Sequence, residues 1–153
     1  IDREDFPALF AMKSDPDDVK WSGFASPPDP ARFQDWFEEA IIDPHRLLFG
    51  GYLEGEMVAY ANFRRSGLTF EPSSGTAAAH RGKGYAVTAR SEAMKAIRAI
   101  EPGAVFVSWI AETNTAAQRS ATKNGFAATS VTKEQVYLFP ERRVEVMRLY
   151  QLP

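Results

Sequence analysis

Residues 80–86 read His-Arg-Gly-Lys-Gly-Tyr-Ala, and an alanine-rich helical pattern follows at once. The first turn of a helix leaves about four backbone N–H groups without partners, and its dipole end is positive. Gly82 and Gly84 carry no side chain that would obstruct a close approach, and Arg81 and Lys83 add full positive charge. The stretch predicts a site for a phosphate or pyrophosphate at the start of a helix. Taken alone, it is equally compatible with an ordinary basic surface turn.

Two well-known phosphate loops do not fit this stretch. A Walker A loop needs four residues between its first glycine and a Gly-Lys pair, and then Ser or Thr. Gly75 lies too far upstream of Gly82, and Lys83 is followed by Gly84. The dinucleotide-binding fingerprint needs a small residue three places after its second glycine, where this chain has Val87. The pattern must belong to another kind of anion site.

The composition is that of one soluble globular domain spanning residues 1–153, with 44% hydrophobic and 25% charged residues. The net charge of −2 gives no reason to expect nucleic-acid binding. No cysteine is present, which excludes disulfides and a cysteine nucleophile, and the two histidines lie far apart, so no metal site is predicted. No apolar run approaches the roughly 20 residues of a membrane span, and no signal peptide is visible. We expect a cytoplasmic protein with no membrane partner.

Helical and strand-like segments alternate along the chain. Helices are predicted over 5–12, 30–41, 84–100 and 114–124, and strands over 47–53, 57–63, 68–78, 104–111, 135–139 and 144–152. Residues 14–30, rich in Pro, Asp and Ser, are predicted to form an irregular connection. Pro72 and Gly75 predict a bulge in the third strand, and Ile100 is expected on the core face of the third helix. The order predicts an α/β (α+β) fold with a mixed sheet and helices on its faces.

Two blocks together resemble the GNAT superfamily of acyl-CoA-dependent N-acyltransferases. The pyrophosphate loop of that family runs Arg or Gln, two residues, Gly, one residue, then Gly or Ala, and residues 81–86 match every fixed place. Residues 112–126 (ETNTAAQRSATKNGF) resemble its later segment, in which a strand ends at an asparagine and a short helix closes on a Gly-Phe pair. The resemblance extends from about residue 47 to residue 153. It implies a single-domain, mostly antiparallel sheet that splays between its fourth and fifth strands.

The resemblance also implies where acetyl-CoA binds. The pantetheine arm would enter the splay and pair with backbone groups of Ser74, Gly75 and Thr76, while Asn114 would contact it from the other side. Asn114 is equally suited to a plain helix cap. The residues that would hold the pyrophosphate are Arg81, Gly82, Lys83, Gly84, Tyr85 and Ala86. The family branch usually has a strand ahead of its first helix, for which residues 1–3 leave almost no room.

The activity implied is N-acetyl transfer from acetyl-CoA to a primary amine by direct attack in a ternary complex, without a metal. The amine must lose a proton, and the tetrahedral oxyanion needs a hydrogen-bond donor. Glu71 and Glu112 are the carboxylates nearest the predicted opening, so they are the candidate general bases; a water-relayed base is the alternative. Many members carry a tyrosine acid seven residues after the asparagine, where this chain has Ala121. Tyr85, Tyr60 or another hydroxyl must replace it, or the thiolate leaves without a dedicated acid.

The resemblance places the acceptor pocket between residues 21–36, residues 43–49 and Tyr137. Trp21, Phe24 and Trp36 either stack on the acceptor or belong to the core. This region resembles ribosomal-protein and nucleotide-amino-sugar acetyltransferases, which leaves a small amine, an amino sugar or a peptide N-terminus as acceptor. A homodimer through the terminal strands is also expected. The rival interpretation is a catalytically inactive acyl-CoA-binding sensor or interaction module.

Overall fold

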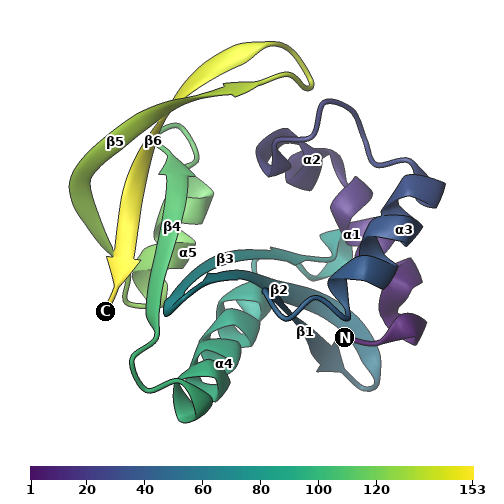
Figure 1. Cartoon of the computed structure of the whole chain (residues 1–153). Coiled ribbons are helices and arrows are strands. Elements are labelled where there is room, and N and C mark those ends of the chain that lie inside the picture. The colour runs from purple at the N-terminus through teal and green to yellow at the C-terminus, as the bar shows by residue number, and fades with distance from the viewer.

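The six strands form one sheet in the order β1-β2-β3-β4-β6-β5, antiparallel at every pairing except β3–β4. The computed structural model describes residues 1–153 (Figure 1). The strands are β1 (Arg46–Leu53), β2 (Glu56–Ser66), β3 (Thr69–Thr76), β4 (Val105–Ala111), β5 (Ala127–Tyr137) and β6 (Arg143–Leu152). The helices are η1 (Arg3–Asp5), α1 (Phe6–Ser14), α2 (Pro16–Ser22), α3 (Pro30–Ala40), η2 (Ala78–His80), α4 (Tyr85–Ile100) and α5 (Thr115–Lys123).

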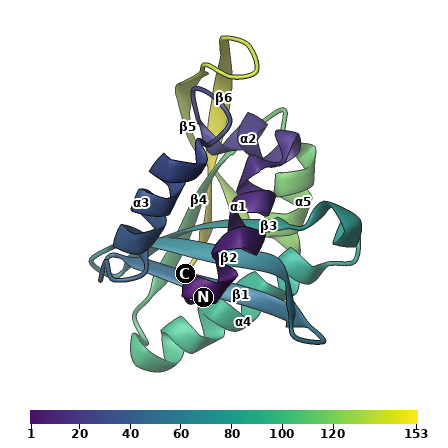
Figure 2. The ribbon, with the colours of Figure 1, turned by 90° about the vertical axis from the view of Figure 1, so that its right-hand side faces the viewer.

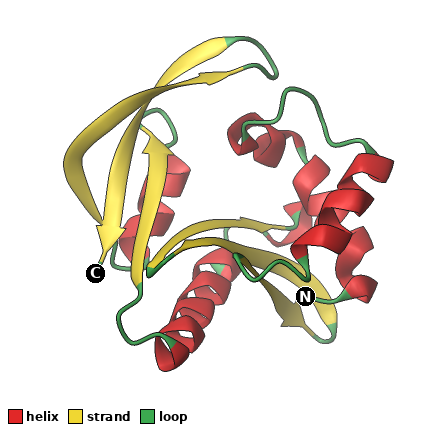
Figure 3. Cartoon of the chain, in the orientation of Figure 1, coloured by secondary structure: helices red, strands yellow, loops and turns green.

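Helices cover both faces of the sheet. α4 packs against β1, β2 and β3 on one face, and α1 packs on β2 and β3 from the other, with α3 beside it (Figure 2). β5 and β6 are long strands that curl away from the rest of the sheet (Figure 3), and α2 contacts them, because Arg143 of β6 donates a hydrogen bond to Lys20 O at 2.7 Å. The predicted mixed, mostly antiparallel sheet with helices on both faces is confirmed. No helix has the length and apolar character needed to cross a membrane.

The predicted irregular connection over residues 14–30 is wrong in its first half, which forms α2. The Asp15 side chain accepts a hydrogen bond from Asp17 N, and Pro16 occupies the first helical position. Both features start a helix even where the apolar pattern is weak. Gly23, at φ 78°, then ends it in a left-handed conformation.

The predicted bulge in β3 is also wrong. β2 and β3 pair without a register shift from Ala59↔Thr76 to Ser66↔Thr69, and the irregularities of the sheet lie between Gly51 and Tyr52 of β1 and between Ala128 and Thr132 of β5. The β2–β3 ladder tolerates Pro72 because its nitrogen faces away from β2, so no hydrogen bond of this ladder is lost. Ala77 N donates to Val58 O at 2.9 Å, which sets the alternation of the ladder. Even-numbered residues of β3 therefore turn their backbone groups away from β2 and toward β4.

β3 and β4 separate almost as soon as they meet. They pair only at Thr69↔Val105 and Phe70↔Phe106, and beyond these pairs the ribbons diverge (Figure 1). The next residue that would donate to β4 is Pro72, which has no N–H. The predicted splay is confirmed, and within residues 1–153 it lies between the third and fourth strands, β3 and β4.

Three apolar clusters hold this arrangement together. The largest lies between the sheet, α4 and α5, and it centres on the fully buried Phe63, Phe70 and Phe106. The second lies under α1 and α3 around Phe37, and the third joins Tyr137 and Met147 on the curled strands to Trp21 of α2. Ile100 was expected in the core but is 80% exposed, because it is the last residue of α4.

The strand predicted over 135–139 is longer than expected and begins at Ala127. Residues 127–136 of β5 are mostly exposed and polar, so they carry no apolar run to mark a strand. Pairing with β6 organises them instead.

Replacing Phe106 by Ala tests the point where the two halves of the sheet still touch. The Phe106 ring lies 6.0 Å from that of Phe63 and 5.8 Å from that of Phe70, with no exposed surface. We expect Phe106→Ala to lower the free energy of unfolding by about 3–5 kcal/mol in denaturant titrations. Ile100→Ala is the matched apolar control and should change it by less than about 0.5 kcal/mol. Equal effects of the two variants would contradict this packing.

Candidate active site

The glycine loop places an open helix end beside the splayed strands. Gly82 and Gly84 have φ 77° and 84°, a conformation that side chains rarely adopt, and a Cβ at either would meet only open space. Gly84 is the N-cap of α4 and offers no side-chain acceptor to the first turn. The N–H groups at the start of this 16-residue helix therefore have no capping partner in the chain. This geometry supports the predicted anion site.

Arg81 ties this loop to the start of α2. Its guanidinium forms ion pairs with Asp15 and, at 2.9 Å, with Asp17. The hydrogen bond and charge of Asp15 raise the pKa of Arg81. Burial acts to raise the pKa of Asp15, but the hydrogen bonds from Arg81 and from the backbone of Asp17 and Asp18, together with the Arg81 charge, outweigh it, and the pKa lies below its ordinary value. Arg81 therefore sits at the loop as predicted, but its charge is already shared with two carboxylates.

Backbone groups of β3 line the splay in an alternating manner. Pro72, Ser74 and Thr76 turn theirs toward the opening, whereas Gly75 lies in the ladder opposite Tyr60. Gly75 has a different reason to be glycine, because a Cβ there would lie 2.6 Å from Tyr60 Cε1. Of the three predicted arm contacts, Ser74 and Thr76 offer backbone groups, and Gly75 makes room for a buried ring.

A cleft of about 390 Å³ runs along this splay, and we call it the donor cleft. It gathers predicted cofactor residues from β3, the glycine loop and the end of β4, namely Ser74, Gly75, Thr76, Arg81, Gly82, Ala86 and Asn114. Lys83, Gly84 and Tyr85 complete the loop without lining the cleft. Asn114 Oδ1 accepts from Ala117 N at 3.1 Å, so its role as the cap of α5 is confirmed.

Arg90, which the sequence did not single out, is buried at the back of the donor cleft with 7% of its surface exposed. It donates to Asn124 Oδ1 and to Ser120 O and Oγ of α5, and more weakly to Ser74 Oγ at 3.4 Å. Its guanidinium also lies 5.8 Å from the Phe126 ring. Burial lowers the pKa of Arg90 to about 10. The residue joins α4, α5 and β3 behind the opening.

A second buried polar cluster comprises Lys13, Asp18 and Tyr60. Lys13 Nζ lies 2.9 Å from Tyr60 Oη and 3.1 Å from Asp18 Oδ2, and Tyr60 Oη donates to Asp18 Oδ1 at 2.9 Å. Burial first, and then the Asp18 charge, raise the pKa of Tyr60 well above its ordinary value. Tyr60 therefore stays protonated, and the cluster fixes the Lys13 ammonium.

A larger cleft, of about 770 Å³, opens between α2, α3 and the strands, and we call it the acceptor cleft. Of the two alternatives that the sequence left open for Trp21, Phe24 and Trp36, the structure places all three in the lining of this cleft, together with Trp109 and Tyr137. It meets the donor cleft in a shared wall made of Lys13, Trp21, Ser22, Pro72, Ser73, Ser108, Trp109, Tyr137 and Met147. A group bound in one cleft is thus in reach of a group bound in the other.

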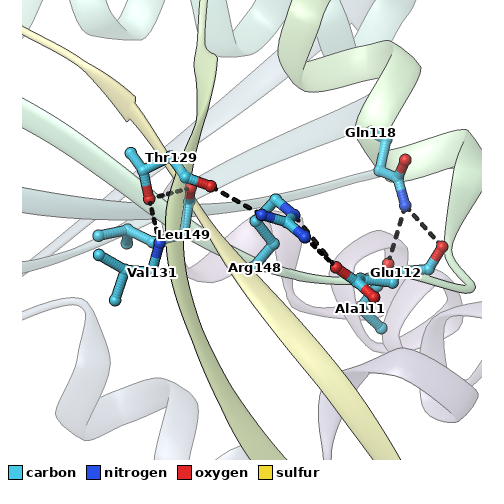
Figure 4. Close-up of polar contacts among 7 residues, drawn as sticks. All are labelled: Ala111, Glu112, Gln118, Thr129, Val131, Arg148 and Leu149. Atoms are coloured by element: carbon cyan, nitrogen blue, oxygen red, sulfur yellow. Dashed lines mark hydrogen bonds and ion pairs between the residues drawn. The ribbon is translucent and has the colours of Figure 1, made fainter.

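The two predicted bases occupy different places. Glu71 lines the acceptor cleft and pairs with Arg64 at 3.2 Å. Glu112 lines neither cleft, because both Nε and Nη2 of Arg148 hold its Oε1 at the outer end of β4 (Figure 4). Gln118 fixes the backbone there by donating to Ala111 O and Glu112 O. The geometry supports Glu71 as a base and gives no support to Glu112.

Sequence reasoning missed two kinds of residue. Some lie in a segment whose helix was not predicted, and others are polar residues of a correctly predicted helix that gave no sign of being buried. Asp18 lies in a segment expected to be irregular, and Lys13 and Tyr60 reach it from α1 and β2. Arg90 stands next to the apolar face of α4, and nothing in the spacing marks it as buried. No group of three or more His, Cys, Asp or Glu side chains that could hold a metal ion occurs in residues 1–153.

This combination of a splayed mixed sheet and an open glycine loop is that of an acyl-CoA-dependent transferase. The chain matches the acetyltransferase (GNAT) domain over residues 1–127, and it belongs to this family of acetyltransferases, which use acetyl-CoA as the acyl donor. No curated protein matches the chain.

Solved structures share the fold at low sequence identity. A ribosomal-protein-alanine N-acetyltransferase from Brucella melitensis superposes with a TM-score of 0.79 at 23% identity, covering 99% of this chain and 96% of its own. A spermidine N-acetyltransferase from Vibrio cholerae, solved with CoA and spermine, gives 0.84 at 16% identity, covering 98% and 90%. A putative acetyltransferase from Salmonella typhimurium, solved with its cofactor acetyl-CoA, gives 0.75 at 23% identity, covering 99% and 90%.

Substituting Gly84 by Asp tests the loop directly. An Asp at this position would bring a negative charge beside the first-turn N–H groups and repel the anion that they are expected to bind. We expect calorimetry to show that Gly84→Asp weakens acetyl-CoA binding at least about tenfold. Gly67→Asp, in the β2–β3 turn, is the matched control, because Gly67 also has a positive φ and open space around it. If both variants bind as the native chain does, the loop is not the pyrophosphate site.

Arg90→Met tests the buried connection behind the donor cleft. The substitution removes the donor to Asn124 Oδ1 and one of the two donors to Ser120 O, which also accepts from Asn124 N; this should lower the free energy of unfolding by about 2 kcal/mol. It should also weaken acetyl-CoA binding, because α5 and Ser74 lose a common anchor. Arg119→Met, on the exposed side of α5, serves as control in the same denaturation and calorimetry series. Unchanged stability in Arg90→Met would show that Arg90 has no structural role.

Proposed function

We propose that this chain transfers the acetyl group of acetyl-CoA to a primary amine by direct attack in a ternary complex. The observation that carries the proposal is the shared wall of the two clefts. Backbone N–H groups of β3 and of the start of α4 would hold acetyl-CoA on one side of this wall. The aromatic acceptor cleft lies on the other side. The chain has no cysteine that could carry the acetyl group as an enzyme thioester, which favours direct attack.

The residues at this wall suit the steps of aminolysis. Glu71 faces the acceptor cleft and would take the proton of the attacking amine, directly or through a water molecule. The N–H groups of Ser74 and Thr76, which face the opening, would donate to the developing oxyanion. The raised pKa of Tyr60 and its hydrogen bond to Asp18 oppose loss of its proton, so we assign to it no proton transfer to the thiolate. The Lys13 ammonium lines both clefts and would stabilise negative charge on the departing thiolate.

Initial-rate kinetics test the proposal against its rival, the inactive acyl-CoA-binding module. Thiol release from acetyl-CoA is followed while both acetyl-CoA and a panel of primary amines are varied. Direct attack predicts intersecting double-reciprocal lines, whereas an acetyl-enzyme predicts parallel ones. Tight acetyl-CoA binding with no amine-dependent thiol release would favour the binding module. The neighbours known to act on spermidine and on a ribosomal-protein alanine support an amine acceptor and do not identify it.

Glu71→Gln and Glu112→Gln separate the two predicted bases. Each glutamate is paired with one arginine, so the two substitutions remove the same charge from similar surroundings. We expect Glu71→Gln to lower kcat/KM about 100-fold, with acetyl-CoA affinity retained. Glu112→Gln should leave kcat/KM close to that of the native chain. A large loss in Glu112→Gln alone would reverse the assignment.

Three further expectations stay predictions: the single domain over residues 1–153, the cytoplasmic location and the homodimer. The homodimer has one supporting feature, because Val136, Val144 and Val146 are exposed side by side on the outer face of β5 and β6. Light scattering on the purified chain would test it.

A further inference from the structure

The charges of the acceptor cleft differ in sign from those of the whole chain. Five basic side chains line this cleft, namely Lys13, Arg32, Arg46, Arg64 and Lys133, against two acidic ones, Asp29 and Glu71. The chain as a whole carries a net charge of −2. Of the five cations, only Lys13 also lines the donor cleft. The other four therefore stand apart from the part of the site that would receive the phosphates of acetyl-CoA.

Two of these cations have no carboxylate partner. Arg46 pairs with Asp43, Arg64 with Glu71, and Lys13 with Asp18. Arg32 and Lys133 form no ion pair and donate no side-chain hydrogen bond within the chain, although both line the cleft. Arg32 lies on α3 and Lys133 on β5, which stand on opposite sides of the opening (Figure 1).

Lys133 is also held in position. Its Nζ lies 4.2 Å from the centroid of the Trp109 ring, at a separation where the ring attracts an ammonium group. Both acidic side chains of the cleft are engaged, because Asp29 caps α3 through Arg32 N at 3.1 Å and Glu71 pairs with Arg64. A polycationic amine would therefore meet more repulsion than attraction here.

We propose that the acceptor is a primary amine that also carries an anionic group, a carboxylate or a phosphate, which Arg32 and Lys133 bind while the aromatic walls contact the rest of the molecule. This inference rests on the proposed function, since it names the acceptor class of the same site. It places a polyamine such as spermidine among the poor acceptors of this chain, in contrast to the Vibrio cholerae neighbour.

Matched acceptors test the inference. With acetyl-CoA saturating, glucosamine 6-phosphate is compared with glucosamine, L-phenylalanine with L-phenylalaninamide, and spermidine serves as the cationic probe. The first pair tests a phosphate and the second a carboxylate. We expect the anion-bearing member of at least one pair to have a KM about tenfold lower than its partner, and added salt to reduce the difference. Equal KM values within both pairs, or spermidine as the best acceptor, would overturn the inference.

Tryptophan fluorescence gives a second measurement that does not depend on turnover. All three tryptophans of the chain, Trp21, Trp36 and Trp109, line the acceptor cleft. Titrating the CoA-saturated protein with the same probes should show tighter binding of an anion-bearing member. If the probes bind with this preference but no thiol is released, the proposed function fails and the inference on the ligand stands. If amines are acetylated without the preference, the inference alone fails.

Lys133→Gln and Arg32→Gln locate the effect. We expect each to raise the KM of the preferred anion-bearing acceptor about tenfold, with kcat little changed and the KM of its neutral partner unchanged. Lys95→Gln is the control, because Lys95 pairs with Glu92 on α4 and lines neither cleft. If the two cleft variants shift the neutral and anionic acceptors alike, these cations are not the anion site.

Discussion

The separation of β3 from β4 is the constraint from which the rest of the site follows. The strands pair at two positions, and the next backbone group that β3 would offer to β4 belongs to Pro72, which has no hydrogen to donate. Ser74 and Thr76 then direct their backbone groups into the opening rather than to a neighbouring strand. Backbone groups in such a position need water or a ligand as partner. An extended arm with amide groups of its own can satisfy them as a strand would.

Keeping a sheet open in this way requires support from outside the ladder. On one side, the rings of Phe63, Phe70 and Phe106 hold the two halves together below the split. On the other, Arg90 reaches across from α4 to α5 and to β3. Burial of this cation without a carboxylate is unfavourable, as its lowered pKa shows, and its carbonyl and amide acceptors offset the cost. A carboxylate partner would have neutralised a charge that the donor cleft can use to attract an anion.

Much of the fold could be predicted because its signals are local. The Gly-Lys-Gly loop and the Asn114 cap are short stretches whose conformation depends on few residues. The buried polar residues could not be predicted, since Lys13, Asp18 and Tyr60 lie far apart in sequence and become a cluster only when α1, α2 and β2 pack. Glu112 is a second residue whose contacts could not be predicted from the sequence. Its position at the end of β4 was predicted, but its pairing with Arg148 depends on a strand from the end of the chain.

The segment from Lys13 to Asp18 forms ion pairs at both clefts. Asp15 and Asp17 hold Arg81 at the entrance of the donor cleft, while Asp18 holds Lys13 at the wall that both clefts share. A pyrophosphate at the glycine loop would compete with Asp15 and Asp17 for Arg81, and any change in those pairs acts on the start of α2. Trp21 and Ser22 of α2 line both clefts, so the helix that begins at these carboxylates also forms part of the wall that the clefts share.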